Sequence, residues 1–422
     1  GESVTTKTDV LIIGGGSIGL NAAYFLLKSG RGVTLLDRAE IGKGSSSGNA
    51  GHIVPSHIVP LAAPGVIPTT IRWMLDPPRS PFGLKINLSP AYLGWLMRFA
   101  ASCTADNVQR AIPALKALGL LSAANFDVMI ASERFECAYK ASGLLFLYLT
   151  EKEFAGGRHE AELLRQNGLP AEILDRAALR QREPAARESI IGGVDFSSDA
   201  SLDPAMFLSL LKEWIAQAGA TLHEHAPVTR LVAENGKIIR VVTPDMEFEP
   251  AQVVLAAGAW SPQLGNLLGL RLPIQPARGY SLTMPATKIM PKGALLLGER
   301  KIAVTPMGDQ LRFTGRLEIG EISTVPDPRW IRRIAESARE YIQLDESLEI
   351  KETWAGLRPT TPDGLPIIGF APKQQNLILA SGHAMLGLSL GPGTGQVVAE
   401  LANGVQSGFD LRAFRAERFQ AK

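Results

Sequence analysis

A glycine-rich turn near the N-terminus constrains the fold more than any other feature of the sequence. Gly14, Gly16 and Gly19 form the motif G-x-G-x-x-G, directly after the apolar run Val10–Ile13. An apolar run without polar alternation predicts a parallel strand that is buried on both faces. The good helix formers of Leu20–Leu27 then predict a helix. This order of strand, glycine turn and helix is typical of a dinucleotide-binding unit.

Each residue of this unit has a distinct physical role. Gly14 permits the tight turn, Gly16 lets a pyrophosphate approach the backbone, and Gly19 lets the helix pack closely on the strand. A second apolar run, Val33–Leu36, ends at Asp37. The spacing of Asp37 from Gly19 is close to the roughly 20 residues expected for a carboxylate that binds a ribose 2′-hydroxyl. The motif alone does not distinguish FAD from NAD, and a purely structural turn is the alternative.

Composition limits the class of protein. The chain has 422 residues, 45% of them hydrophobic and 20% charged, which suits a large core and two domains. Because 43 basic residues face 41 acidic ones, nothing predicts binding to nucleic acid. Cys103 and Cys137 form neither a C-x-x-C pair nor a metal-ligand spacing, so we expect no metal site and no disulfide framework. A reducing cytoplasm is the expected location.

One apolar segment leaves contact with a membrane open. No uninterrupted apolar run reaches the roughly 20 residues that span a bilayer. The segment Ala91–Ala101, AYLGWLMRFAA, predicts a helix that packs on its own domain. The alternative is peripheral contact with the inner face of the cell membrane, which would suit an enzyme that passes electrons to a membrane carrier.

The order of predicted strands and helices divides the chain into two interleaved domains. Nucleotide-type segments at 1–60, 190–270 and 350–422 predict one discontinuous α/β domain that binds the cofactor. The segments 61–189 and 271–349 predict a second domain that is inserted twice, with antiparallel strands in its second part. No fixed-period repeat is present, which excludes solenoids and propellers.

Two later segments bear on the choice between FAD and NAD. The strand-like segment Val253–Ser261 ends in small residues, which bring bare backbone to the ligand-binding edge of an open α/β sheet. A packing layer of small residues is the alternative. Several glycines after Gly382 precede a predicted helix, Gln396–Ala402. The start of this helix would stabilise the negative charge of a reduced flavin near N1 and O2, a demand that NAD lacks.

Several motifs in this order resemble the FAD-dependent D-amino acid dehydrogenase and oxidase family, which is related to glycine oxidase and sarcosine oxidase. They are DVLIIGGGSIGLNAAYFL, SSSGNAGHIVPSHIVPLAAPGV, LAAGAWS, RGYSLTMP, WAGLRPTTPDGLPIIG and GHAMLGLSLGPGTGQ. GNAG with APGV, and RGYSLTMP, are most similar to the bacterial dehydrogenase branch. The resemblance implies a glutathione-reductase-like Rossmann domain that binds FAD, with an inserted antiparallel-sheet substrate domain.

The resemblance also implies which residues bind the cofactor. Those near the pyrophosphate and adenosine are Gly14, Gly16, Ser17, Ile18, Gly19, Asp37, Arg38 and Val228. Those beside the isoalloxazine ring or on the second cofactor strand are Ser46, Asn49, Ala50, Gly51, His52, Ala257, Gly258, Trp260, Met385, Leu386, Gly387 and Leu388. Neither cysteine lies in a flavin-contacting motif, which favours a non-covalent flavin.

Three residues are candidates for the catalytic site. Arg358 in GLRP is the carboxylate clamp that the resemblance implies, and a planar guanidinium suits bidentate binding of a carboxylate. Tyr280 would add a hydroxyl, with a packed strand tyrosine as the alternative. His52 is expected at the flavin rather than as a base, because hydride transfer needs a neutral amine and correct alignment.

The resemblance implies oxidative deamination of a D-amino acid, including a cyclic one such as D-proline or D-hydroxyproline. A hydride would pass from the α-carbon to flavin N5, and the electrons would go to a quinone or another acceptor than oxygen. Three alternatives remain: an oxidase of the same fold that uses oxygen, a flavoprotein subunit that relays electrons in a larger complex, and an NAD-dependent dehydrogenase.

Overall fold

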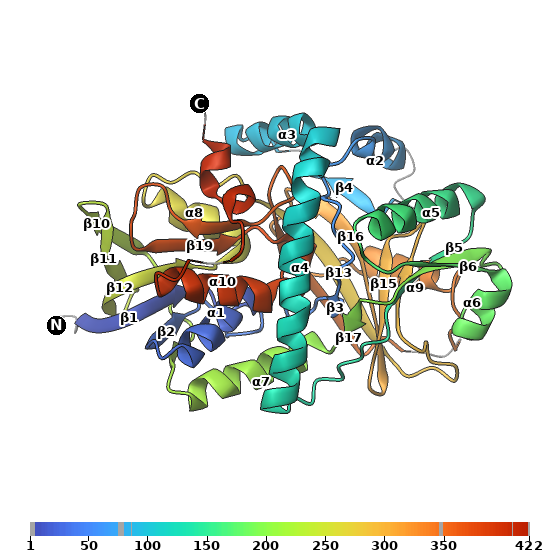
Figure 1. The fold of residues 1–422 in the computed structure, drawn as a ribbon, viewed down its shortest axis with the longest axis horizontal. Coiled ribbons are helices and arrows are strands. Elements are labelled where there is room, and N and C mark those ends of the chain that lie inside the picture. Colours follow the sequence, from blue (N-terminus) through green and yellow to red (C-terminus); the bar gives the residue numbers. More distant parts are fainter. Residues whose placement is uncertain (1–4, 75–79, 86, 346–348, 407, 421–422) are drawn as a thin grey trace.

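Two β-sheets lie side by side and build the molecule, with the long helix α4 (Ala105–Glu133) crossing in front of their boundary in Figure 1. The computed structural model describes residues 5–74, 80–85, 87–345, 349–406 and 408–420. The predicted α/β architecture with two sheets is confirmed.

The first sheet has a parallel centre. Its neighbours in order are β19 (Leu377–Ser381), β12 (Glu247–Leu255), β1 (Thr5–Ile13), β2 (Val33–Leu36) and β9 (Thr221–His223). β18 (Ile367–Phe370) extends the sheet antiparallel to β19, and the hairpin of β10 (Arg230–Glu234) and β11 (Lys237–Val242) pairs with the start of β12. The apolar run at the end of β1 is buried, as its sequence predicts.

Helices cover one face of this sheet. α1 (Ser17–Lys28) packs against α7 (Pro204–Gln217) and α10 (Gly391–Ala402), and α10 packs in turn against α4. Alternate strand residues such as Ile12 and Leu35 meet Leu20 of α1 in the core between sheet and helices. Their neighbours Leu11 and Leu36 face a second core on the other side. Both faces of the sheet are therefore covered, and its carboxyl edge is left for a ligand.

The second sheet is larger and mixed. Its strands in order are β17 (Glu352–Thr360), β13 (Gln275–Pro285), β16 (Gln310–Ile319), β15 (Ile302–Met307), β14 (Ala294–Leu297), β5 (Leu144–Tyr148), β7 (Gly192–Phe196) and β6 (Glu172–Asp175), with β4 (Phe82–Leu84) beside β16. The sequence predicts antiparallel strands, and most pairs are antiparallel. The pairs β14–β5 and β16–β4 are parallel, and the long stretches of chain between their strands permit this arrangement.

Shorter elements surround the second sheet and the boundary. The helices are α2 (Val66–Met74), α3 (Pro90–Ser102), α5 (Glu151–Gln166), α6 (Arg176–Arg182), α8 (Ser261–Asn266) and α9 (Pro328–Ala338). β3 (His52–Ile53) pairs with β8 (Ala200–Ser201). Four short 3-10 turns occupy Gly258–Trp260, Ala384–Leu386, Arg412–Phe414 and Ala416–Phe419. The predicted helix at Ala91–Ala101 corresponds to α3.

Among the residues that the structure describes, α4 is the helix long and apolar enough to cross a membrane. One side of it is used inside the fold, since Leu115, Leu118 and Phe126 are buried. Ser122 on the same helix bonds to the backbone at the start of α10. α4 therefore connects the helical layer of the first sheet with the segments around the second.

Two strands lie in a different sheet from the one that the domain boundaries predict. Residues 190–270 and 350–422 were both predicted to belong to the cofactor domain, but β7 pairs with β5 and β6, and β17 pairs with β13. A buried apolar or small-residue strand has the same pattern in either sheet, so periodicity does not reveal its partner. The boundary therefore lies after β7 in one place and after β17 in the other.

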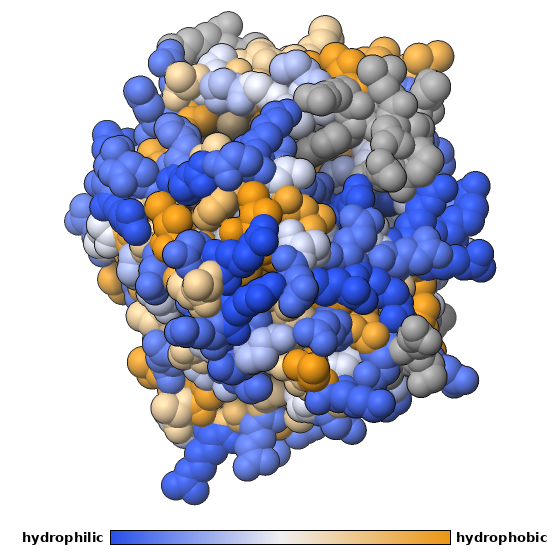
Figure 2. All heavy atoms as spheres, turned by 90° about the vertical axis from the view of Figure 1, so that its right-hand side faces the viewer, coloured by the Kyte–Doolittle hydropathy of each residue, from blue (hydrophilic) through white to orange (hydrophobic). Residues whose placement is uncertain are grey.

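The side of the molecule formed by the second sheet and its helices is shown in Figure 2. Hydrophilic side chains prevail there and are interspersed with smaller hydrophobic areas. Such a mixture is ordinary for a solvated protein surface.

Candidate active site

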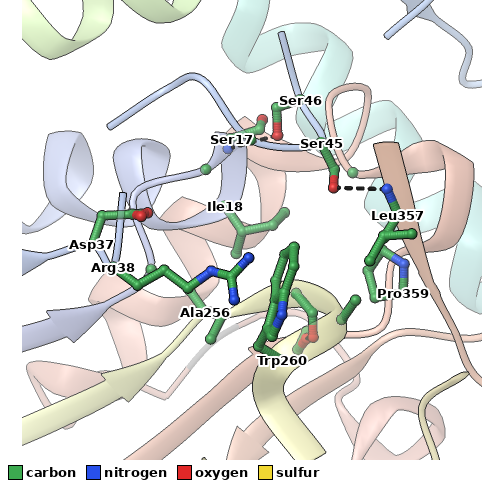
Figure 3. Close-up of a pocket in the computed structure, with 18 of the residues that line it drawn as sticks. Ser17, Ile18, Asp37, Arg38, Ser45, Ser46, Ala256, Trp260, Leu357 and Pro359 are labelled. Carbon is green, nitrogen blue, oxygen red and sulfur yellow. Dashed lines mark hydrogen bonds between the residues drawn. The ribbon is translucent and has the colours of Figure 1, made fainter. Parts of the chain in front are cut away.

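A cavity of about 630 Å³ opens where the parallel strands of the first sheet end. Its wall includes the carboxyl ends of β1, β2 and β19 and the residues that follow β12. β17 supplies the opposite wall, so the cavity lies between the two sheets. In Figure 3, Asp37 and Arg38 lie on one side, and Leu357 and Pro359 lie on the other. Ligands of open α/β sheets bind at this edge.

Most of the predicted cofactor residues line this cavity. They are Gly14, Gly16, Ser17, Ile18, Asp37, Arg38, Ser46, Asn49, Val228, Ala257, Gly258, Trp260, Gly387 and Leu388, and Arg358 joins them. Gly19, Ala50, Gly51, His52, Tyr280, Met385 and Leu386 do not line it. The folded chain therefore brings together segments from both ends and the middle of the sequence.

The glycine turn has the geometry that its spacing predicts. Gly14 adopts φ 109°, a left-handed conformation that favours glycine, and a Cβ there would lie 2.3 Å from the carbonyl oxygen of Ala256. A Cβ at Gly19 would lie 1.8 Å from the carbonyl oxygen of Gly14, so this glycine permits close packing of α1 on β1. Gly16 faces the cavity, with Ser46 as its one near neighbour among the described residues. Its backbone is open to a ligand.

Polar and aromatic groups line the end of the cavity at β2. The Asp37 carboxylate accepts hydrogen bonds from the backbone N–H groups of Gly15 at 2.7 Å and Ala39 at 2.8 Å. The Arg38 guanidinium carbon lies 3.7 Å from the centre of the Trp260 ring, and Figure 3 shows the two side by side. Asp37 thus holds the turn in place, while Arg38 and Trp260 form a flat cationic surface.

The serine-rich loop after β2 connects both walls. The Ser46 hydroxyl accepts a hydrogen bond from Ser17 N at 3.1 Å, and the Ser45 hydroxyl accepts one from Leu357 N at 3.1 Å (Figure 3). Arg312 of β16 donates to the carbonyl oxygens of Ser47 and Asn49 from the other side. The loop is therefore fixed to the first helix and to the second sheet.

The continuation of this loop turns into the protein. A Cβ at Gly51 would lie 2.0 Å from the carbonyl oxygen of Leu202, so Gly51 is a packing position. His52 Nε2 lies 2.9 Å from the hydroxyl of Thr305, which also donates to the carbonyl oxygen of Ala50. Burial lowers the pKa of His52 to about 3, so the imidazole is neutral at pH 7. Contact of Ala50, Gly51 and His52 with the flavin ring is a prediction that the cavity wall does not support.

Arg358 presents a charge without a counter-ion. It lies on β17 in the cavity wall, and no carboxylate within the described part of the chain pairs with it. Its Nη1 donates to the carbonyl oxygen of Arg316 at 3.0 Å. Burial lowers its pKa to about 10, so it remains protonated at neutral pH. A partly desolvated guanidinium beside a cavity is suited to bind an anion.

Tyr280 does not line the cavity, so the cavity wall does not support its predicted contact with the substrate. Successive residues of a strand face opposite sides, and Gly279, not Tyr280, faces the Arg358 guanidinium. The Tyr280 ring is fully buried in the core behind the sheet, and its hydroxyl donates to Glu318 Oε2 at 2.9 Å. The alternative of a packed strand tyrosine describes its position.

The glycines at the start of α10 serve helix packing. The sequence predicts a helix from Gln396, but α10 begins at Gly391. A Cβ at Gly395 would lie 2.6 Å from the backbone of Asn21 in α1, and one at Gly393 would lie 3.0 Å from Ser122 in α4. Gly393 N donates to the Ser122 hydroxyl at 3.0 Å, so this donor is already satisfied. An anion cradle at this helix start stays a prediction, and the contacts of Gly393 and Gly395 show that these two glycines serve packing against α4 and α1.

The turn before α10 supplies part of the cavity wall. Gly387 and Leu388 line the cavity, whereas Met385 is exposed at the surface and Leu386 packs in a neighbouring core. His383 also lines the wall, and its Nε2 lies 3.0 Å from the hydroxyl of Thr394. Burial lowers the pKa of His383 to about 3. This histidine is neutral and structurally engaged.

Trp354 is a wall residue that the sequence interpretation missed. Its ring lies so close to Gly48 and Gly356 that a Cβ at either glycine would meet it at 2.0 or 2.1 Å. A signal was present, because Trp354, Gly356 and Arg358 alternate along one strand and share a face. With Arg358 assigned to the site, this alternation predicts that Trp354 lies on the same face of the strand and lines the site as well.

Neither cysteine lines the cavity: Cys103 ends α3 and Cys137 is buried in a core. In the described part of the chain, no group of three or more His, Cys, Asp or Glu side chains could hold a metal ion. The chemistry of the site therefore has to be built from the arginine, the neutral histidines and whatever the cavity binds.

The geometry of the cavity suits FAD. The start of α1 carries no acidic residue in its first turn and lies at the cavity, so its partial positive charge is available to a phosphate. A Cβ at Gly258 would meet no described atom within 4 Å, which leaves bare backbone in the turn that follows β12. Asp37 beyond the turn is placed for a ribose, and Arg358 lies across the cavity. The adenosine part would lie at Asp37, the pyrophosphate at Gly14 and Gly16, and the flavin toward β17.

Comparison with known proteins agrees with this assignment. The model of the family described as FAD dependent oxidoreductase matches residues 9–401. The chain is 32% identical over 417 residues to D-amino acid dehydrogenase of Paramagnetospirillum magneticum, covering 97% of this chain and 98% of the relative. It is 33% identical over 426 residues to D-amino acid dehydrogenase of Allorhizobium ampelinum, covering 98% of this chain and 99% of the relative.

Solved structures show the same fold at lower identity. Glycine oxidase from Geobacillus kaustophilus superposes with a TM-score of 0.82 at 23% identity, covering 99% of this chain and 100% of the other. L-Proline dehydrogenase from P. horikoshii superposes with a TM-score of 0.75 at 21% identity, covering 99% and 100%. Given the match of the family model over most of the chain, together with the full-length relatives, the protein belongs to the family of FAD-dependent oxidoreductases that includes the D-amino acid dehydrogenases.

Proposed function

We propose that the protein oxidises a D-amino acid to the imine, which water then hydrolyses. The observation that carries this proposal is Arg358, a guanidinium in the cavity wall with no acidic partner among the described residues. An amino acid offers the carboxylate that this charge lacks. The names of the full-length relatives support the same class of reaction and the D configuration.

The residues of the chain would act by binding and alignment. Arg358 would bind the carboxylate bidentately, while its bond to the Arg316 carbonyl fixes the plane of the guanidinium. Bound FAD supplies two-electron oxidation by accepting a hydride. His52 and His383 are neutral at pH 7, which accords with a site that needs no strong base. The amine has to lose its proton to solvent before the hydride leaves the α-carbon.

The finer identity of the substrate and acceptor extends the proposal. We favour a small or cyclic substrate such as D-proline or D-hydroxyproline, because the rings of Trp354 and Pro359 line the wall beside Arg358 and offer an apolar surface to an aliphatic ring. FAD would be held without a covalent bond, since neither cysteine lines the cavity. The electrons would pass to a quinone.

Because a quinone acceptor resides in the membrane, the enzyme would be cytoplasmic and would bind peripherally to the inner face of the cell membrane. Apolar side chains on and just before α3 support this placement: Leu93, Met97 and Leu88 are exposed, the last two to 70% and 78%. Apolar groups of this kind can enter the interfacial region of a bilayer.

An anaerobic reduction assay tests the proposal. Purified protein would be mixed with D-, L- and N-substituted amino acids, including the isomers of proline and hydroxyproline, while the flavin absorbance is followed. We expect bleaching by D-amino acids and slow recovery in air. Fast recovery with peroxide would instead identify an oxidase. If dithionite bleaches the flavin and no amino acid does, the proposal is wrong and a relay subunit becomes the better reading.

The variant Arg358→Gln sharpens the test. Loss of a charged hydrogen bond costs about 1.5–3 kcal/mol, so the half-saturating substrate concentration should rise roughly 10- to 150-fold. The half-saturating concentration of Arg358→Lys should lie between those of the unchanged protein and Arg358→Gln, because lysine keeps the charge but lacks the planar guanidinium. The exposed Arg332→Gln in α9 is the control and should leave the concentration unchanged. An Arg358→Gln variant that behaves like this control would refute the role of the clamp.

A further inference from the structure

A β-bulge in the second sheet lies directly beside Arg358. The pairing of β13 with β16 runs through Arg278 and Glu318 and resumes only at Tyr280 and Gly315. Arg316 lies in the interrupted stretch and adopts φ 60°, a left-handed conformation that is unusual for a residue with a side chain. Bulges re-aim groups next to active sites. Here the carbonyl oxygen of Arg316 accepts the hydrogen bond from Arg358 Nη1 at 3.0 Å.

Gly279, on the neighbouring strand, lies beneath the guanidinium. It pairs with Gly356, and Arg358 pairs with Ala277, so the arginine side chain crosses diagonally onto the next strand. A Cβ at Gly279 would lie 2.3 Å from Cζ and Nη1 of Arg358 and 2.4 Å from Nη2. The guanidinium therefore rests flat on the bare backbone of Gly279. Any side chain at this position would displace the end of the arginine before it disturbs the sheet.

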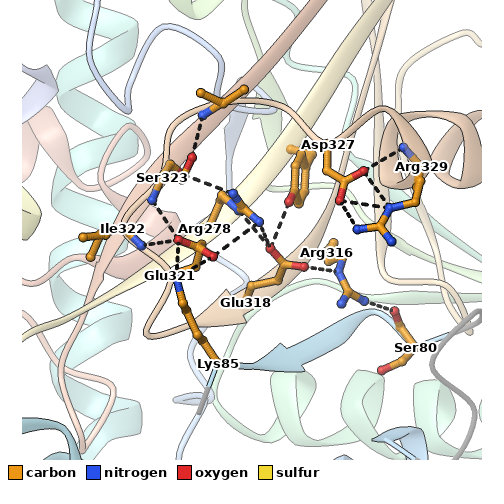
Figure 4. Close-up of polar contacts among 12 residues, drawn as sticks. Ser80, Lys85, Arg278, Arg316, Glu318, Glu321, Ile322, Ser323, Asp327 and Arg329 are labelled. Carbon is orange, nitrogen blue, oxygen red and sulfur yellow. Dashed lines mark hydrogen bonds and ion pairs between the residues drawn. The ribbon is translucent and has the colours of Figure 1, made fainter. Parts of the chain in front are cut away.

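The side chain of Arg316 is held away from the cavity. Its Nε bonds to Glu318 Oε1 at 2.8 Å, its Nη1 bonds to the carbonyl oxygen of Ser80 at 2.9 Å, and its guanidinium carbon lies 3.2 Å from the centre of the Trp330 ring. Glu318 Oε2 also accepts from Tyr280 at 2.9 Å and pairs with Arg278 at 2.8 Å. Figure 4 shows this network. It fixes the Arg316 backbone in its left-handed state.

We propose that Gly279 and the bulge at Arg316 are positioning residues for Arg358. Gly279 supplies the flat support, and the Arg316 carbonyl fixes one edge of the guanidinium, so that its free edge faces the substrate carboxylate. The ion-pair network behind the sheet acts through this carbonyl. The inference rests on the proposed function for its substrate, but its geometry concerns Arg358 alone.

The variant Gly279→Ala tests the support. We expect the half-saturating D-amino acid concentration to rise at least tenfold with a smaller change in the limiting rate of flavin reduction. In a protein that already carries Arg358→Gln, adding Gly279→Ala should change the half-saturating concentration less than twofold, because the guanidinium that Gly279 supports is no longer present. Gly293→Ala is the matched control: it lies directly before β14 in the same sheet, its Cβ would meet the Ser142 hydroxyl oxygen at 2.6 Å, and it should leave both constants near those of the unchanged protein. The proposal is wrong if Gly279→Ala leaves the half-saturating concentration unchanged. It is also wrong if the fold-changes of the two single variants multiply in the double variant.

The variants Arg316→Gly and Arg316→Ala distinguish the effect of the left-handed backbone at position 316 from the effect of the Arg316 side chain. Both remove the ion pair with Glu318, but glycine adopts a positive φ without strain. We therefore expect Arg316→Ala to raise the half-saturating concentration more than Arg316→Gly does. Equal effects would show that the bulge carbonyl plays no part.

A crystal structure of Gly279→Ala keeps the test independent of catalysis. The proposal requires the Arg358 guanidinium to leave the Arg316 carbonyl in this variant. If no amino acid reduces the unchanged protein, the proposed function fails while this structure still decides the positioning role. A guanidinium that stays in place would refute it.

Discussion

Asp199 is a buried carboxyl group that contributes to the pH dependence of stability. It is almost completely buried, and its carboxylate accepts hydrogen bonds from the backbone N–H and the hydroxyl of Ser56. Burial raises its pKa from 3.8 to about 7, although the bonds from Ser56 act in the opposite direction. No cation among the described residues pairs with Asp199, so desolvation prevails over hydrogen bonding. The folded protein therefore keeps a proton on Asp199 that the unfolded chain releases.

This difference predicts how stability changes with pH. Because the folded-state pKa lies above the unfolded one, the contribution of Asp199 to the free energy of unfolding should fall as pH rises from about 4 to 7 and then level off. The variant Asp199→Asn removes this contribution and should gain stability relative to the unchanged protein across that window. Urea unfolding at pH 4, 5.5 and 7 measures the difference in free energy of unfolding between the variant and the unchanged protein. Asp309→Asn, at an exposed position, is the control and should show no such difference. A difference between Asp199→Asn and the unchanged protein that does not vary with pH would contradict the prediction.

Single residues also show what the sequence could and could not reveal. The roles of Gly14 and Gly19 followed from spacing, because the turn and the helix contact are local. Arg358 followed from a motif. Tyr280 was misplaced because a strand residue faces one of two sides, and only the pairing of β13 with β16 and β17 decides which.

At the scale of elements, the contact of α10 with α1 and α4 depends on small residues. Gly391 lies against Ser17 and Asn21, Gly393 against Ser122, and Gly395 against the backbone of Asn21. These glycines let the backbones of three helices approach closely. A glycine-rich sequence before a helix is compatible both with such packing and with a ligand-binding loop, so the sequence alone does not distinguish them. That ambiguity explains why the anion cradle was predicted there. The packing partner, α4, is hundreds of residues away in the chain.

Gly395→Ala should therefore destabilise the fold. Its Cβ would meet the Asn21 backbone at 2.6 Å, and overpacking of this kind costs about 1–3 kcal/mol of unfolding free energy. Gly156→Ala in α5 is the matched control, since a Cβ there meets nothing within 4 Å. That change should stabilise the protein by about 1 kcal/mol, because alanine is the better helix former. Urea unfolding of both variants measures the contrast, and equal responses would be inconsistent with tight helix packing.

At the scale of the whole molecule, the cavity joins two sheets that are otherwise built separately. Gly14 and Asp37 belong to the first sheet and its turns, whereas Trp354 and Arg358 belong to the second. A ligand that fills the cavity contacts both. The sequence predicted two interleaved domains, but it placed β7 and β17 in the wrong one because the partner of a strand is a property of the assembled fold.

Removal of FAD should lower the melting temperature. Free cofactor at 100 times its dissociation constant stabilises a folded protein by about 2.7 kcal/mol. The variant Asp37→Ala should gain less from the same FAD concentration, because it loses the carboxylate placed for the ribose and the bonds that hold Gly15 and Ala39. Thermal scans with and without FAD measure both effects. An equal gain in Asp37→Ala would exclude a role for this carboxylate in binding.

The position of β17 has a consequence for exchanging parts between relatives. Trp354 and Arg358 are hydrogen-bonded into the second sheet through β13, although the chain on their C-terminal side returns to the first. A chimera that takes its second sheet from a relative, with a junction near residue 350, would set a foreign β13 against a native β17. The junction belongs after Thr360, so that the strand carrying the arginine travels with the strand on which that arginine rests.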